Sequence, residues 1–225
     1  MSKKSQSDES GSRLSDYVYQ ALMDRILSGR FRSGDVIAEK TLAEELGVSR
    51  TPVHVALREL VKDGFLTQQK NRRPVVAELS ADDVSELFDM RALLEGEAAA
   101  LAAEKMDRAT LESLQASGEK LKAIDSFDAL VEKWVSYEDE FHGAIAEASG
   151  NKRLAKNIRH FRLSHRAFVI NVLDPQYIKE GLKEHLGVLD AIEKKDSEKS
   201  RDRMNAHIKK WQPYFIRVRP KSLSV

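Results

Sequence analysis

The stretch "TLAEELGVSRTPVHVALRELVKDGFL", residues 41–66, contains two helix-like runs separated by only a few residues. The first run ends at Gly47, and glycine tolerates the left-handed conformation with which many helices close. Ser49 can cap the second run, and Pro52 is tolerated in its first turn because those N–H groups have no helical acceptor. The pattern predicts a helix-turn-helix.

The second predicted helix has two distinct faces. Its inner, apolar face is formed by Val48, Val53, Leu57, Leu60 and Val61. Polar side chains crowd its start and face outward, namely Ser49, Arg50, Thr51 and His54. The N-terminal residues of a recognition helix reach base edges in the major groove of DNA. Hydroxyl and guanidinium groups suit contacts to phosphates and bases, so these four residues are candidate DNA contacts.

A predicted β-hairpin follows Gly64. The segment "FLTQQKNRRPVVAEL" has two short extended runs around a polar tip. The tip is basic and consists of Lys70, Asn71, Arg72 and Arg73. Helix–turn–helix pairs also occur in proteins that do not bind DNA, but a hairpin with a basic tip completes a winged helix. Residues 14–79 are therefore predicted to form a winged helix-turn-helix.

Composition limits the remaining possibilities. The 225 residues are 41% hydrophobic and 32% charged, which is typical of a soluble protein with a real core. The absence of cysteine excludes disulfides and thiolate metal sites. No apolar run is long enough to span a membrane, so a cytoplasmic location is expected. The net charge of +1 does not indicate DNA binding, which must rest on local placement. Residues 1–13 are polar and Ser-rich and are predicted to form a disordered tail.

Residues 80–218 are predicted to form an all-α bundle of about six helices, followed by a tail over 219–225. The expected helices are 81–105, 108–123, 127–148, 151–172, 175–194 and 197–218. Asp174 can cap the helix that Pro175 opens. The fold class is thus mainly α, with a winged helix-turn-helix before a helical bundle.

Three helices of the bundle place a histidine on their apolar stripe. His142 lies four residues after Glu138, so both point the same way, while His185 and His207 lie on the stripes of the last two helices. Imidazoles and a carboxylate that converge in a dry interior form a plausible divalent-metal site. The alternative for each histidine alone is a hydrogen-bonded core residue, and His165 also lies on an apolar stripe.

Arg91 lies on the apolar stripe of the first bundle helix. A guanidinium directed inward needs an anionic partner. One interpretation is an internal salt bridge, with Glu138 or Glu95 among the possible partners. The other is a clamp for the carboxylate of a ligand, since the guanidinium fork matches that geometry.

The stretch "LAEELGVSRTPVHVALRELVKDGFL" resembles the DNA-binding domain of the GntR family of transcription regulators. The resemblance implies that Lys40, Arg50, Thr51 and the wing contact operator DNA. Two positions depart from the family pattern. Ser33 stands where a proline usually precedes the glycine of the first loop, and His54-Val55 replaces the usual Arg-Glu. The arginine at that position commonly reaches DNA, so a different operator preference is expected here.

Three further stretches resemble the FCD effector domain of the FadR-like GntR branch: "DVSELFDMRALLEGEAAALAAEKM", "EDEFHGAIAEASGN" and "EHLGVLDAIEKKDSEKSRDRMNAHI". The resemblance implies a divalent metal, zinc, nickel or manganese, held by Glu138, His142, His185 and His207. The family usually has Asp where this chain has Glu138. The resemblance also favours Arg91 as the clamp for the carboxylate of a small organic acid.

The expected function is a ligand-responsive transcription regulator. A homodimer would place two recognition helices on a two-fold, double-stranded operator. An organic acid bound near the metal would change operator affinity. The alternative is a metal-dependent enzyme acting on a small carboxylate. It is disfavoured because the sequence has no separate general base, phosphate loop or nucleophile elbow.

Overall fold

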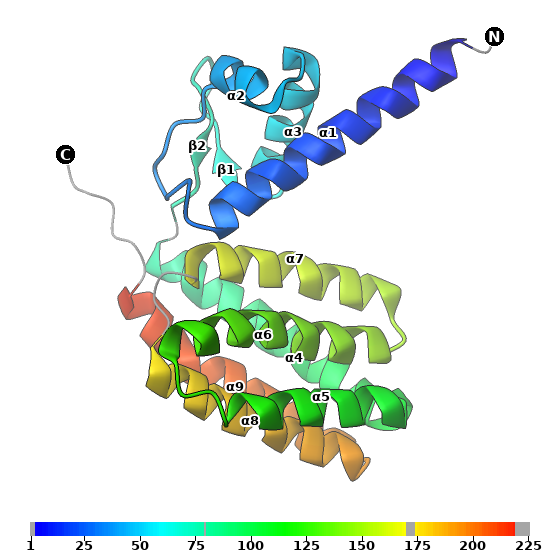
Figure 1. Ribbon diagram of the computed structural model, residues 1–225. Coiled ribbons are helices and arrows are strands. Elements are labelled where there is room, and N and C mark those ends of the chain that lie inside the picture. The colour runs from blue at the N-terminus through cyan, green and yellow to red at the C-terminus, as the bar shows by residue number, and fades with distance from the viewer. Residues whose placement is uncertain (1–2, 79, 170–173, 219–225) are drawn as a thin grey trace. The chain divides into compact units, whose positions relative to one another are not determined.

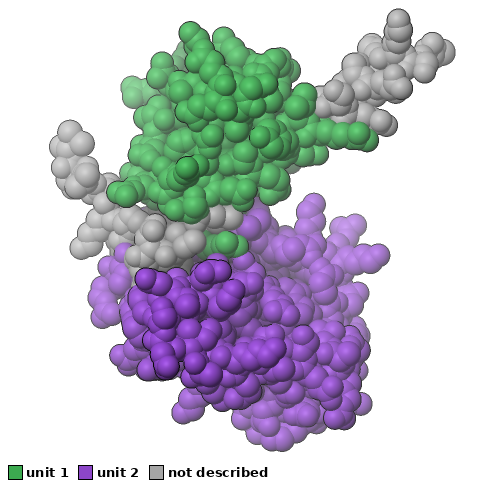
Figure 2. All heavy atoms as spheres, viewed as in Figure 1, with its two compact units in different colours: residues 1–79, 166–170, 220–225 green, residues 80–165, 171–219 purple. Residues whose placement is uncertain are grey.

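The computed structural model describes residues 3–78, 80–169 and 174–218, and these are mainly helical (Figure 1). They fall into two compact units (Figure 2). One contains the described part of residues 1–79 together with residues 166–169, and the other contains residues 80–165 and 174–218. The mainly α fold class predicted from the sequence is confirmed. Among the described helices, none combines the length and the apolar character that crossing a membrane requires.

The first unit is a winged helix-turn-helix. Its helices are α1 (Lys3–Leu27), α2 (Glu39–Leu46) and α3 (Arg50–Lys62), and its wing strands are β1 (Leu66–Thr67) and β2 (Val75–Val76). The strands pair antiparallel, with Leu66 opposite Val76 and Thr67 opposite Val75. The core contains Val18, Leu22 and Ile26 of α1, and Val53, Leu57 and Leu60 of α3.

The turn between α2 and α3 forms as the sequence predicts. Gly47 closes α2 with φ 66° and ψ 29°, a left-handed conformation that glycine adopts without a steric penalty. Ser49 occupies the N-cap position of α3 but its hydroxyl makes no capping hydrogen bond. Val53, Leu57 and Leu60 are buried, whereas Val48 and Val61 are only half-buried.

The start of α1 differs from the sequence prediction. A disordered tail was expected over residues 1–13, but α1 begins at Lys3. The physical reason is that α1 packs on α3 further along, and a helix that has a nucleus extends at one hydrogen bond per added residue. The predicted tail over 219–225 lies outside the described residues, as do the last residues of the predicted helix 151–172.

The second unit is a bundle of six described helices. They are α4 (Ala81–Lys105), α5 (Arg108–Leu121), α6 (Phe127–Ala148), α7 (Lys152–Val169), α8 (Pro175–Glu193) and α9 (Ser197–Val218). Local signals set several of their starts. Ser80 and Asp83 form a reciprocal capping box at α4, and Asp174 accepts a hydrogen bond from the Tyr177 N–H at α8 (2.8 Å). The predicted role of Asp174 as a cap is confirmed.

The long helices α4 and α9 pack against each other, and α8 packs on α9 (Figure 1). The α4–α9 crossing is close because residue 96 is a glycine. A Cβ atom at Gly96 would overlap with Oδ1 of Asn205. This approach brings Glu95, next to Gly96, and His207, two residues after Asn205, toward the centre of the bundle.

Candidate metal centre and DNA-binding face

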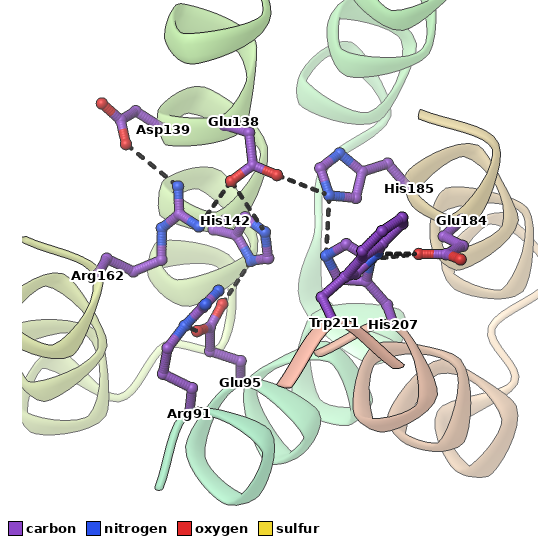
Figure 3. Close-up of polar contacts among 10 residues, drawn as sticks. All are labelled: Arg91, Glu95, Glu138, Asp139, His142, Arg162, Glu184, His185, His207 and Trp211. Atoms are coloured by element: carbon purple, nitrogen blue, oxygen red, sulfur yellow. Dashed lines mark hydrogen bonds and ion pairs between the residues drawn. The ribbon is translucent and has the colours of Figure 1, made fainter. Parts of the chain in front are cut away.

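Four side chains predicted as metal ligands meet in the interior of the second unit. Glu138 and His142 come from α6, His185 from α8 and His207 from α9, and all four are buried. One potential ligand atom from each lies within 4.8 Å of the others. The Nε2 atom of His185 is 3.4 Å from Oε1 of Glu138 and 3.2 Å from Nε2 of His207 (Figure 3). The cluster offers three nitrogens and a carboxylate oxygen.

Two of the histidines are oriented by carboxylates behind them. Nδ1 of His142 contacts Oε2 of Glu95, and Nδ1 of His207 lies 2.8 Å from Oε2 of Glu184 (Figure 3). A carboxylate at Nδ1 holds the proton there and leaves the lone pair of Nε2 for a metal, an arrangement common among metal-binding histidines. His207, whose Nδ1 is hydrogen-bonded to Glu184, is thus held in the tautomer that a metal requires, whereas His142 lies against Glu95 without a hydrogen bond.

His185 is oriented differently. Its ring stacks on Phe141, with centroids 3.8 Å apart and an interplanar angle of 10°, and on Trp134 at 5.2 Å and 13°. Its Nδ1 is buried and has no hydrogen-bond partner among the described residues. Aromatic stacking therefore fixes this imidazole, rather than a hydrogen bond to a carboxylate.

Glu138 is held by Arg162 of α7. Nη1 of Arg162 donates to Oε2 of Glu138 at 2.9 Å, and Nη2 donates to Oδ1 of Asp139 at 3.1 Å. Oε1 of Glu138 has no hydrogen-bond partner among the described residues, although it is buried. One carboxylate oxygen is thus occupied by the guanidinium and the other faces the histidines. Glu138 is one methylene longer than the Asp usual at this position, and its Oε1 still lies inside the cluster.

The protonation states of the clustered side chains favour the binding of a cation. Burial lowers the pKa of His142 and of His185 well below the usual range, so both are neutral. Burial alone would raise the pKa of Glu138, but the positive charge of Arg162 beside it lowers it overall. Neutral imidazoles and an ionised carboxylate are the forms that bind metal. The buried Oε1 of Glu138 without a partner fits the same conclusion, so the residues present suit a divalent ion.

Arg91 forms the internal salt bridge that the sequence left as one of two interpretations. Its Nε donates to Oε1 of Glu95 at 2.8 Å, and both side chains are 3% exposed. Glu95 therefore bridges Arg91 and His142. The role of Arg91 as a clamp for a ligand stays a prediction.

Sequence reasoning missed three residues of the centre. Arg162 follows Ile158 by four residues and precedes His165 by three, so helical spacing could have placed it on the buried face. Glu95 was considered only as a partner of Arg91. Glu184 carries no comparable signal, because its contact with His207 depends on how α8 and α9 pack.

His165 is a buried histidine outside the ligand set. Its ring makes edge contacts with Phe88 and Phe215, and its Nε2 has no hydrogen-bond partner among the described residues. Burial lowers its pKa well below the usual range. It is a core histidine, as the alternative expected, but its Nε2 lacks the hydrogen bond that the alternative implied.

The predicted DNA contacts lie on the surface of the first unit. All are exposed: Lys40, Ser49, Arg50, Thr51 and His54 at α2 and α3, and Lys70, Asn71, Arg72 and Arg73 between β1 and β2. Asn71 adopts a positive φ of 59° in the wing turn, a conformation that Asn tolerates better than most residues. Their roles at DNA remain predictions.

One carboxylate pairs with two of these residues. Glu39 at the start of α2 lies 3.3 Å from Nε of Arg50 and 3.3 Å from Nδ1 of His54. The pairs are exposed, and exposed ion pairs hold side chains weakly. Sequence reasoning missed Glu39, because the contact depends on the angle between α2 and α3.

Known proteins share this architecture. Residues 14–76 match the family described as bacterial regulatory proteins, gntR family, and residues 86–210 match the FCD domain. The HTH-type transcriptional regulator YdhC of Bacillus subtilis (strain 168), itself uncharacterized, is 30% identical over 191 residues, or 84% of this chain and 85% of that protein. The Nta operon transcriptional regulator of Aminobacter aminovorans is 30% identical over 185 residues, or 82% and 86%.

A solved structure shows the same overall fold. The structure of E. coli McbR/YncC aligns with a TM-score of 0.77 and 25% sequence identity, covering 91% of this chain and 97% of that one. These family matches and the names of the relatives indicate transcription regulators rather than enzymes, which sets aside the metal-dependent enzyme. The chain belongs to the GntR family of bacterial transcription regulators and carries an FCD domain after its winged helix-turn-helix.

Proposed function

We propose that this GntR-family regulator responds to a small organic acid that binds beside a divalent metal ion in its FCD domain. The observation that carries the proposal is the convergence of four buried ligand atoms within 4.8 Å, from Glu138, His142, His185 and His207. Such a cluster without a cation would leave Oε1 of Glu138 and Nε2 of His142 buried and unpaired. Unpaired buried polar groups are costly, so binding of an ion would remove that cost.

The donor set does not single out one metal. Three imidazole nitrogens and one carboxylate oxygen suit zinc, nickel or manganese, and they do not choose among these. When bound, the ion would supply a positive anchor for a carboxylate oxygen of the effector. Protein side chains would hold the rest of the effector.

Arg91 is the proposed partner of an effector carboxylate. Its Nε is taken by Glu95, and a guanidinium carries five N–H donors in all. Its remaining donors are therefore the ones proposed to bind the ligand. Arg162 is less suited to this role, because it already binds both Glu138 and Asp139.

The proposed DNA-binding face consists of the start of α3 and the tip of the wing. Arg50 and Thr51 are proposed to contact the operator from the N-terminal turn of α3, where recognition helices read base edges. The wing residues Lys70, Arg72 and Arg73 would add contacts to phosphates. For Arg50 and His54, DNA would compete with Glu39, which pairs with both in the structure described here.

A homodimer is proposed because one recognition helix covers only half of a two-fold operator. The effector would change operator affinity by binding one arrangement of the dimer better than another.

The test is a gel shift with full-length protein on DNA selected from a random library. We expect a specific complex that weakens steeply with salt, on a selected sequence with two-fold symmetry. A small organic acid that shifts the melting temperature of the metal-loaded protein should also change the amount of complex. Selection that yields no preferred sequence, or complexes insensitive to every such acid, would contradict the proposal.

A further inference from the structure

A second hollow lies in the bundle, lined by residues outside the candidate metal centre. It has a volume of about 500 Å³ and is formed by α5, α6, α8 and the turn after α5. We call it the α5–α8 groove. Its apolar floor consists of Leu121, Ile124, Leu130, Ile178, Leu182 and Leu186. This volume is in the range of pockets that bind small molecules, commonly about 300–1,000 Å³.

The rim of the groove is positively charged. Lys122, Lys179 and Lys183 line it together with the single carboxylate of Glu119. Lys122 pairs with Glu119 at 2.7 Å. Lys179 and Lys183 are exposed, lie four residues apart on α8, and form no ion pair with any described residue. Two unpaired ammonium groups thus stand beside an apolar floor.

A buried hydroxyl lies near the groove residue Leu186. The hydroxyl of Tyr137 is buried and has no hydrogen-bond partner among the described residues. It lies 2.8 Å from the position that a Cβ atom on Gly118 would take, and Leu186 lies 3.1 Å from the same position. Since α5 carries no side chain there, Tyr137 and the groove residue Leu186 both reach the backbone of α5.

We propose that the α5–α8 groove binds an amphipathic carboxylate, with its hydrocarbon part on the leucines and isoleucines and its acid group at Lys179 and Lys183. Burial of a hydrocarbon on this floor supplies affinity, and charge complementarity sets the orientation. This site differs from the proposed effector site, because none of its lining residues is a predicted metal ligand or Arg91. One helix nevertheless serves both sites, since His185 lies between Leu182 and Leu186 in α8.

The test is calorimetric titration of octanoate into the full-length protein after metal removal with EDTA. We expect saturable binding at a single site. Lys179→Gln with Lys183→Gln should weaken it about tenfold or more, because two charged contacts are lost. The matched control is Lys152→Gln with Lys156→Gln, which removes two exposed charges with the same spacing on α7 and should leave affinity unchanged.

Three further measurements locate the site. The neutral analogue octanol should bind about tenfold more weakly than octanoate, since it lacks the charge that the lysines recognise. Ile124→Glu places a carboxylate on the half-exposed part of the floor and should abolish octanoate binding in a protein that still melts cooperatively. Glu138→Gln should leave octanoate binding unchanged, which separates this inference from the proposed metal site.

Several outcomes would overturn the proposal. One is the absence of saturable octanoate binding, and another is unchanged affinity in the double-lysine variant. A third is a changed octanoate affinity in Glu138→Gln, in either direction, which would place the ligand in the metal cluster. Finally, sedimentation showing that Ile124→Glu converts a dimer to a monomer would make the groove a protein interface instead.

Discussion

The two functional regions of this regulator are built in opposite ways. In the FCD domain, Glu138, His142, His185 and His207 are buried and held by further buried or half-buried side chains. On the winged helix, the candidate DNA contacts are exposed, and Arg50 and His54 share an exposed pairing with Glu39. A site for one small ion benefits from a fixed geometry. A face for DNA must release its local partners when phosphates arrive.

The difference also sets what each region responds to. Salt screens contacts in a dry interior only weakly. Between exposed charges, it largely screens interactions over distances greater than about 10 Å at moderate ionic strength. Metal binding should therefore depend mainly on pH and ligand identity, and DNA binding mainly on salt. The following five predictions test this contrast from the largest expected effect to the smallest.

Removal of one ligand should have the largest effect. We expect His207→Ala to weaken metal binding by more than about 100-fold, since even the loss of an orienting partner often costs about 10–100-fold. Competition with a chromophoric chelator measures the affinity. His160→Ala is the control, because His160 lies outside the cluster. Equal metal affinity in the two variants would remove His207 from the ligand set.

Loss of an orienting carboxylate should have the next largest effect. Glu184→Gln removes the charge at Nδ1 of His207 and should weaken metal binding about 10–100-fold. Glu180→Gln is a matched control, because Glu180 and Glu184 both bind Lys210 at 2.6 Å but only Glu184 contacts a histidine. Equal losses in the two variants would show that Lys210, rather than His207, carries the effect.

On the DNA face, Arg50→Ala should weaken operator binding by about 1–3 kcal/mol and relax the preference at the base it reads. Lys70→Ala should instead weaken binding to all sequences alike and lower the salt slope by about 1. Fluorescence anisotropy over a series of salt concentrations separates the two patterns. If Arg50→Ala weakened binding to all DNA sequences equally, Arg50 would be a phosphate contact and not a base contact.

The buried His165 predicts a pH dependence of stability. Its pKa is lowered by burial, so below the usual value of about 6.5 the unfolded chain binds a proton that the folded state resists. The contribution of His165 to stability should thus be fully present above that pH and should fall as the pH drops through it, by at most about 1.4 kcal/mol per pH unit. Urea unfolding of the metal-free protein measures the slope.

The variant His165→Leu should show a shallower slope than the parent protein between about pH 6.5 and pH 5. His160→Gln provides the comparison for removal of a histidine outside the buried core. If His165→Leu kept the full slope, the loss of stability on acidification would come from other groups.

The smallest effect is expected at His54. The substitution His54→Arg restores the residue usual in the family and adds a permanent positive charge, so operator affinity should rise modestly while the preferred base changes. Selection from a random library with both proteins detects the change. Identical affinity and identical preferred sequences would exclude position 54 as a DNA contact.

The sequence predicted the elements better than the contacts between them. Six bundle helices could be read from apolar periodicity and from breaks such as Asp174-Pro175, because those signals are local. The spacing of Glu138 and His142 placed both on one face of α6 for the same reason. The apolar stripes of their helices also predicted that His185 and His207 point into the interior, and the resemblance to the FCD family strengthened the interpretation that all four residues meet.

The partners of the site residues could not be predicted in this way. Glu184 contacts His207 across α8 and α9, and Arg162 reaches Glu138 from α7. Each contact joins residues more than twenty positions apart and depends on helix packing. The disordered tail expected before residue 14 is an error of local structure and not of helix packing. The polar composition of this segment did not reveal that α1 begins at Lys3.

The most direct test of the central claim is calorimetric titration of zinc, nickel and manganese into the metal-stripped, full-length protein. The account predicts one saturable site per chain for at least one of these ions, and no such site in His207→Ala. A stripped protein that binds none of the three ions, or one that binds them equally well without His207, would contradict it.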